Sequence, residues 1–90
     1  MPPNTPLRVQ RKAEVIEQLG VCLSTLRTRI IDGLYPPPIS LGARAVGWLA
    51  HETEAVIAAI AAGRSNNQIR ELVQQLVELR TQLAKHYHAQ

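Results

Sequence analysis

Residues 20–48, GVCLSTLRTRIIDGLYPPPISLGARAVGW, constrain the fold more than any other part of the chain. A glycine turn precedes a segment rich in basic and hydroxyl side chains, and three consecutive prolines follow it. Proline ends a helix because it lacks a backbone N–H and its ring clashes with the preceding turn. Two short apolar runs then surround a glycine-containing turn. This order predicts a helix, a rigid exit and a β-hairpin, which is typical of a helix-turn-helix followed by a wing.

Residues 23–32 are predicted to form the recognition helix of this motif. At about 100° per residue, Leu23, Leu26 and Ile30 share one apolar arc, and Arg27 lies at its edge. Gly33 then ends the helix. The opposite side carries the polar residues Ser24, Thr25, Thr28, Arg29 and Asp32.

Helical spacing also appears before the recognition helix and after the hairpin. Val15, Ile16 and Leu19 predict a first helix over roughly 11–19, ended by Gly20. Residues 39–41 and 45–48 are expected to pair as the hairpin, and a third helix is expected from residue 50 or 51 to Gly63. Ser65 followed by Gln68 forms a capping-box pattern, which predicts the start of a fourth helix at about residue 66.

Length and composition are those of one small domain. The chain has 90 residues, of which 46% are hydrophobic, but it contains no Phe. Its core is therefore aliphatic and marginal in size, and Trp48 is expected to fill part of it. Residues 1–6, with three prolines, are predicted to be a disordered leader.

Three features predict a cytoplasmic protein. The longest uncharged apolar run, residues 55–63, is too short to span a bilayer. The N-terminus has no apolar core of a signal peptide. The lone Cys22 has no second cysteine with which to form a disulfide or a metal cluster. We predict that it behaves as a half-buried apolar residue.

The charge distribution favours a polyanionic partner for the first half of the chain. The net charge is +3, with six basic and three acidic side chains in residues 1–50 and four of each in residues 51–90. All of the excess therefore lies in the half that contains the predicted recognition helix. Excess positive charge attracts nucleic acid.

Several short motifs occur in a characteristic order over about 55 residues. They are Gly20-Val21, Ser24-Thr25-Leu26, Gly33-Leu34-Tyr35-Pro36, Leu41-Gly42-Ala43-Arg44, Val46-Gly47-Trp48 and Glu52. In these motifs the chain resembles the AlpA family of phage-derived regulators, which are small winged-helix proteins related to excisionases and to the DNA-binding heads of the MerR family. It differs from the family at Cys22, where a capping Ser is usual, and at Arg27, where a Tyr is common.

The resemblance implies a mainly α fold with a small β-hairpin wing that binds double-stranded DNA. It places Ser24, Thr25 and Arg27 on the recognition helix and Arg44 on the wing. From its place on the outer arc, Arg29 is suited to a bidentate contact with guanine, and Arg27 to a phosphate. The predicted DNA-binding residues are therefore Ser24, Thr25, Arg27, Thr28, Arg29 and Arg44. The alternatives are a solvated helix face and an arginine in a turn that only aids solubility.

No pattern typical of catalysis is present, so an enzyme is not expected. The sequence has no Ser/His/Asp order and no phosphate-binding glycine loop. His86 and His88 lack an accompanying Cys or carboxylate at ligand spacing, so no metal is predicted. No cofactor, small-molecule ligand or membrane contact is indicated. Glu52 is interpreted as a first-turn residue that faces the helix dipole.

The C-terminal segment 64–90 carries an apolar stripe, apart from the DNA-binding domain predicted for residues 7–63. A stripe with 3-4-3-4 spacing fits a coiled-coil seam or a helix folded back on its own domain. We favour self-association, which gives a homodimer.

With a DNA-binding domain and a dimerisation helix, the protein is expected to act as a transcriptional regulator or as an excisionase-like recombination directionality factor. The alternative is a protein-interaction module that uses this helix without specific DNA binding. The stripe consists of Ile69, Leu72, Leu76, Leu79 and Leu83.

Overall fold

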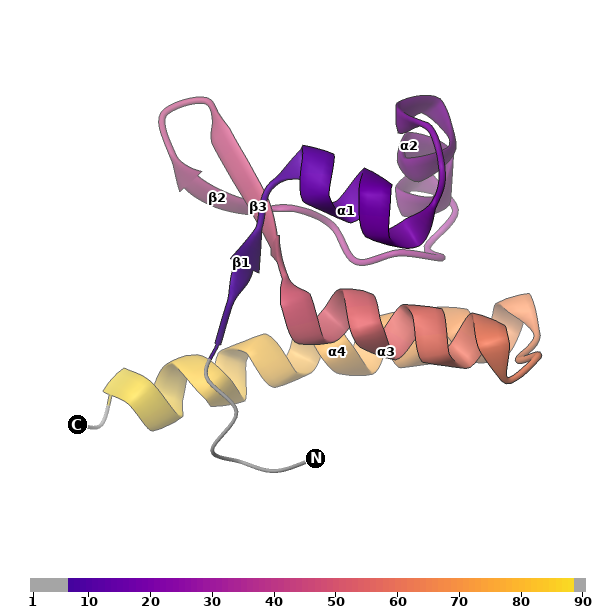
Figure 1. Cartoon of the computed structure of the whole chain (residues 1–90). Helices are drawn as coiled ribbons and strands as arrows, with labels where there is room; N and C mark the ends of the chain where they lie inside the picture. Colours follow the sequence, from indigo (N-terminus) through magenta and orange to yellow (C-terminus); the bar gives the residue numbers. More distant parts are fainter. Residues whose placement is uncertain (1–6, 89–90) are drawn as a thin grey trace.

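The computed structural model describes the backbone of residues 7–88 and the side chains of residues 7–84, so the predicted leader and the side chains of His86 and His88 lie outside the described parts. The fold is mainly α with a small antiparallel sheet, as predicted (Figure 1). The elements in chain order are β1 (Val9–Gln10), α1 (Lys12–Leu19), α2 (Leu23–Ile31), β2 (Ile39–Gly42), β3 (Ala45–Leu49), α3 (Ala50–Ala61) and α4 (Asn66–His88).

The sheet has the order β1-β3-β2, with both neighbours of β3 antiparallel to it. The hairpin β2–β3 is the predicted wing, whereas β1 pairs Val9 with Leu49 and was not predicted. Gly47 lies on the central strand, where an added Cβ would sit 2.7 Å from Val9 Cγ1 and 2.9 Å from Leu41 Cδ1. Only glycine therefore lets both outer strands bring these side chains over β3.

The helix boundaries agree closely with the local sequence signals. The recognition helix α2 ends at Ile31, one residue before the predicted end. At the start of α4, the predicted capping box forms in both directions. The Gln68 backbone N–H donates to Ser65 Oγ at 3.2 Å, and the Ser65 N–H donates to Gln68 Oε1 at 2.9 Å. Reciprocal bonds of this kind satisfy two of the free donors at a helix start.

Helix α4 folds back along α3 and contributes to the same core as the winged domain (Figure 1). Ile69, Val73 and Leu76 are 4–6% exposed and pack in one cluster with Val15 and Trp48. Ile60 of α3, by contrast, is 42% exposed. Residues of α4 therefore form part of the core of the domain.

The structure favours the second alternative for the α4 stripe, a helix folded back on its own domain, over self-association through the whole stripe. Ile69 and Leu76 are buried within the single chain, so they are not accessible to a second copy. Leu72 and Leu83 are half-buried, and Leu79 is 43% exposed. Within residues 7–88, no helix is long and apolar enough to cross a membrane.

Replacing Trp48 with Ala is expected to unfold most of the protein. The indole is 3% exposed, packs tilted on Tyr35 and donates from Nε1 to the Pro36 carbonyl at 3.0 Å. The cavity and the lost bond together cost about 3–5 kcal/mol, which is comparable with the total stability of a small domain. Urea denaturation followed by circular dichroism measures this. Trp48→Phe, which keeps most of the ring, serves as the control and should lose less. Native-like unfolding of Trp48→Ala would contradict the core assignment.

Candidate nucleic-acid interface

The outer face of α2 presents the polar side chains predicted for DNA contact. Ser24, Thr25, Arg27 and Thr28 are exposed, whereas Leu26 on the opposite face is 1% exposed. The Thr28 hydroxyl donates to the Ser24 carbonyl at 3.0 Å, which leaves its oxygen lone pairs outward. The helix is therefore fixed in rotation by its core face and offers hydroxyl and guanidinium groups on the other.

Cys22 begins this helix as an exposed residue and not as the half-buried one we predicted. Its side chain forms no cap hydrogen bond within the described part of the chain. Its Sγ lies 3.2 Å from both Ser24 Oγ and Thr25 Oγ1. Hydrogen bonds from Ser24, and next from Thr25, lower the pKa of the Cys22 thiol to about 7. The uncapped first turn leaves backbone N–H groups for an anion such as a phosphate.

Arg27 and Arg29 are placed differently from each other. Arg27 is exposed, whereas Arg29 is half-buried and donates from Nη2 to the Leu34 carbonyl at 3.3 Å. The Arg29 Nε is buried without a hydrogen-bond partner among the described residues. We expected Arg29 squarely on the outer arc, but its head is folded against the exit of α2. Sequence periodicity misses this because a long side chain can bend back to a carbonyl beyond the helix end.

Arg44 lies at the tip of the wing in an unfavourable backbone conformation. It is exposed, follows Ala43 in the turn between β2 and β3, and has a φ of 61°. Left-handed backbone costs about 1–2 kcal/mol for a residue with a Cβ, and glycine avoids most of this cost. The wing and α2 stand on the same side of the α3–α4 pair (Figure 1). The structure thus places α2, which carries exposed polar residues, and the hairpin with its strained basic turn on the same side of this helix pair.

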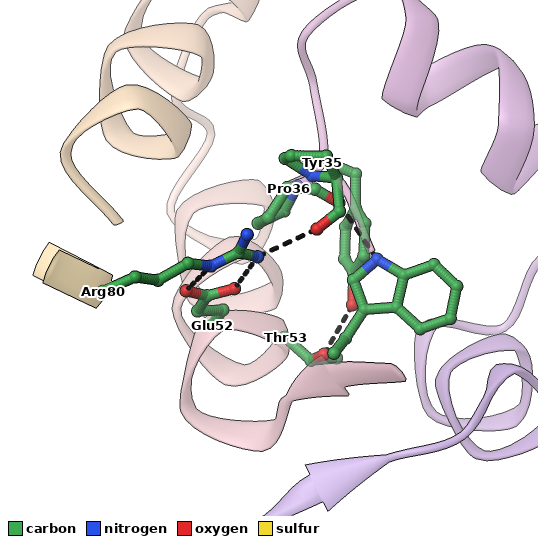
Figure 2. A network of polar contacts seen from close by, with 7 residues as sticks. Tyr35, Pro36, Glu52, Thr53 and Arg80 are labelled. Carbon is green, nitrogen blue, oxygen red and sulfur yellow. Dashed lines mark hydrogen bonds and ion pairs between the residues drawn. The ribbon is translucent and has the colours of Figure 1, made fainter. Parts of the chain in front are cut away.

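The segment 32–38, which joins α2 to the wing, is held through its backbone by three side chains from two elements, α4 and β3. Arg70 of α4 donates to the Asp32 carbonyl at 2.8 Å, and Arg80 of α4 donates to the Pro37 carbonyl at 2.9 Å. Trp48 of β3 holds the Pro36 carbonyl between them (Figure 2). Three prolines remove backbone donors from this region. Its position therefore depends on donors supplied from outside.

Tyr35 links the same segment to α3 through its side chain. Its ring is 1% exposed, and its hydroxyl is hydrogen-bonded to Thr53 of α3 (Figure 2). Burial, more than any neighbouring charge, raises the pKa of the Tyr35 phenol above its ordinary value of 10.0. The hydroxyl therefore stays protonated at neutral pH and acts as a fixed structural link.

Glu52 of α3 and Arg80 of α4 form an ion pair next to the segment 32–38. Glu52 is fully buried and accepts two bonds from Arg80, at 2.9 Å from Nε to Oε2 and 2.7 Å from Nη2 to Oε1 (Figure 2). Glu52 lies in the first turn of α3, as predicted. Its burial and its pairing with Arg80 were not predicted. One sequence signal was available. Glu52 shares a helix face with Val56 four positions later, so it falls on the buried stripe of α3.

Comparison with known proteins is consistent with this architecture. The family described as "Prophage CP4-57 regulatory protein (AlpA)" matches residues 8–59. The chain belongs to the AlpA family. A curated relative of this AlpA-family protein, the uncharacterized protein ORF88 of Enterobacteria phage P4, is 39% identical over 64 residues, which cover 71% of this chain and 73% of that protein. No solved structure matches the chain. The family match runs from β1 into α3 and does not include α4.

Replacing Arg80 with Met is expected to destabilise this AlpA-family protein strongly. It leaves the fully buried Glu52 carboxylate without its partner, which costs about 3–5 kcal/mol. Urea denaturation gives the loss, and Arg64→Met, at an exposed arginine, is the control. The double variant Glu52→Leu/Arg80→Met should recover much of the stability, because an apolar pair needs no charge compensation. An Arg80→Met loss no larger than that of Arg64→Met would show that the pair is unimportant.

Proposed function

We propose that this AlpA-family protein binds double-stranded DNA in a sequence-dependent manner. In this proposal α2 enters the major groove and the β2–β3 wing contacts the adjacent backbone. The observation that carries the proposal is that α2, with its exposed polar residues, and the hairpin β2–β3, whose turn holds the exposed and strained Arg44, stand on the same side of the α3–α4 pair. A winged helix-turn-helix docks through these two elements. A non-glycine residue held at positive φ is itself a pointer to function.

We assign the contacts according to exposure. The hydroxyls of Ser24, Thr25 and Thr28 face base edges or phosphates near the start of α2. Arg27 and Arg44 are the exposed cations of the predicted contact set, and both are assigned to phosphates. Arg29 donates to the Leu34 carbonyl. It can contact a guanine only if its side chain first breaks this hydrogen bond and turns outward.

The biological role follows from DNA binding in one of two ways. A regulator controls transcription from its site, whereas an excisionase-like directionality factor shapes DNA for a recombinase. Both roles use the same contacts. An integrase encoded beside the gene, and stimulation of excision by that integrase in vitro, distinguish the second role from the first.

The decisive experiment selects bound sequences from a random duplex pool with the full chain. The selected site is then titrated at several salt concentrations. For roughly four to six phosphates neutralised per dimer, log K falls against log salt with a slope of about −3.5 to −5.5. An enriched sequence with such a slope supports the proposal. A slope near zero, or no binding at low salt, overturns it.

Replacing Arg44 with Gly separates the effect of this residue on stability from its effect on DNA binding. Glycine relieves the left-handed strain at φ 61°, so the free energy of unfolding should rise by up to about 1 kcal/mol. DNA binding should weaken similarly for all sequences, and the salt slope should flatten by about one unit, because one phosphate contact is lost. Urea denaturation and salt titration measure the two effects. Arg64→Gly is the control for lost charge outside the wing. Unchanged DNA affinity in Arg44→Gly would remove the wing from the interface.

A second candidate is a protein-interaction module based on α4. It is favoured by an apolar groove of about 360 Å³ beside that helix, lined by Leu7, Ile39, Leu49, Arg80, Leu83 and Ala84. Retention on duplex DNA or heparin that falls with salt distinguishes the two candidates. A module of this kind, with only a solvated basic face, shows no preference for a DNA sequence.

We retain the homodimer as a proposal that uses what remains exposed of the stripe. Leu79, at 43% exposure, is the residue of α4 best placed to contact a second copy. Sedimentation of the full chain over a concentration series should show a dimer, and Leu79→Glu should shift it towards monomer without unfolding it. Ile60→Glu, at 42% exposure on α3, is the matched control and should leave the dimer intact. A monomer at all concentrations would contradict the dimer.

A further inference from the structure

Ile31 is the most exposed large apolar residue among those that the structure describes. It is 83% exposed, whereas the other exposed large apolar residues are at 42–43%. An isoleucine contributes to stability through burial, and at this exposure it contributes little. The fold therefore gives no reason for an isoleucine at this position.

The position of Ile31 in α2 places it on the proposed DNA-binding face. It follows Ser24 by seven residues, Arg27 by four and Thr28 by three, which is the spacing of one helix face. Leu26 and Ile30 pack against the core from the other side and fix the rotation of the helix. The exposed apolar side chain thus continues the polar face of α2 toward its C-terminal end.

The surroundings of Ile31 fit a small apolar target better than a protein surface. Its neighbours on this face, Arg27 and Thr28, are polar and exposed, and the other exposed large apolar residues belong to other parts of the chain. Protein-docking sites are contiguous apolar patches, which a single isoleucine does not make. In the DNA major groove the C5-methyl of thymine is the one apolar group on a base edge.

We propose that Ile31 contacts the C5-methyl group of a thymine and thereby makes thymine the preferred base at one position of the site. This inference rests on the proposed DNA binding. The contact is specific because cytosine, adenine and guanine carry no methyl group at the major-groove edge, and an isoleucine cannot satisfy the hydrogen-bonding groups that they present there. Ile31 adds sequence preference without adding charge.

The test replaces each thymine of the selected site in turn with deoxyuridine, which removes only the methyl group. At one position, the wild-type chain should bind the deoxyuridine duplex about three- to tenfold more weakly. Ile31→Ala should bind the two duplexes equally at that position, as in a double-mutant cycle. Ile60→Ala, another exposed isoleucine, is the control and should keep the full penalty. The salt slope should be unchanged in Ile31→Ala, because no phosphate contact is lost.

The outcomes separate this inference from the proposed function. Equal binding of all deoxyuridine duplexes by the wild-type chain overturns the thymine contact but leaves DNA binding intact. A penalty that persists in Ile31→Ala assigns the methyl contact to another residue and also overturns it. A selected site without thymine has the same consequence. Failure to select any site overturns the proposed function itself, and the inference with it.

Discussion

The paired burial of Glu52 and Arg80 is the constraint on which the rest of the structure depends. A carboxylate with no solvent exposure is stable only if its charge and its lone pairs are satisfied. Arg80 meets this need in bidentate fashion and also donates to the Pro37 carbonyl. Because Arg80 comes from α4, Glu52 from α3 and Pro37 from the exit of α2, one guanidinium joins three segments that are distant in the sequence.

Through these contacts, α4 helps to fix the positions of α2 and the β2–β3 hairpin, the two elements of the proposed interface. Arg70 and Arg80 hold the two ends of the segment between α2 and the β2–β3 hairpin, and Trp48 holds the Pro36 carbonyl between them. A two-element interface binds tightly only when both elements are already in the bound geometry, since ordering them on binding costs free energy. The family match ends at residue 59. The segment beyond it nonetheless supplies buried core residues and the donors that fix this geometry.

Local signals in the sequence predicted the helices and the hairpin. How these elements pack together depends on contacts between residues far apart in the sequence. The end of α1 at Gly20, the end of α2 before the prolines and the Ser65–Gln68 box all depend on residues within four positions of one another. Strand β1 was missed because two residues carry no periodicity. The partner of Glu52 lies 28 positions away, and no local pattern identifies it. The stripe of α4 was ambiguous for a related reason, because a 3-4 spacing serves equally a second copy or the chain's own core.

Arg44 and Ile31 are two positions at which the chain departs from local rules. An arginine at φ 61° is less stable than a glycine there, and an isoleucine at 83% exposure is buried by nothing in the fold. Natural sequences agree with their own structure at most positions and violate local rules mainly at functional sites. One of these residues sits on the wing tip and the other on the outward face of the recognition helix, the two elements that a winged helix presents to DNA. Folding explains neither choice, whereas a ligand that spans both elements explains the two together.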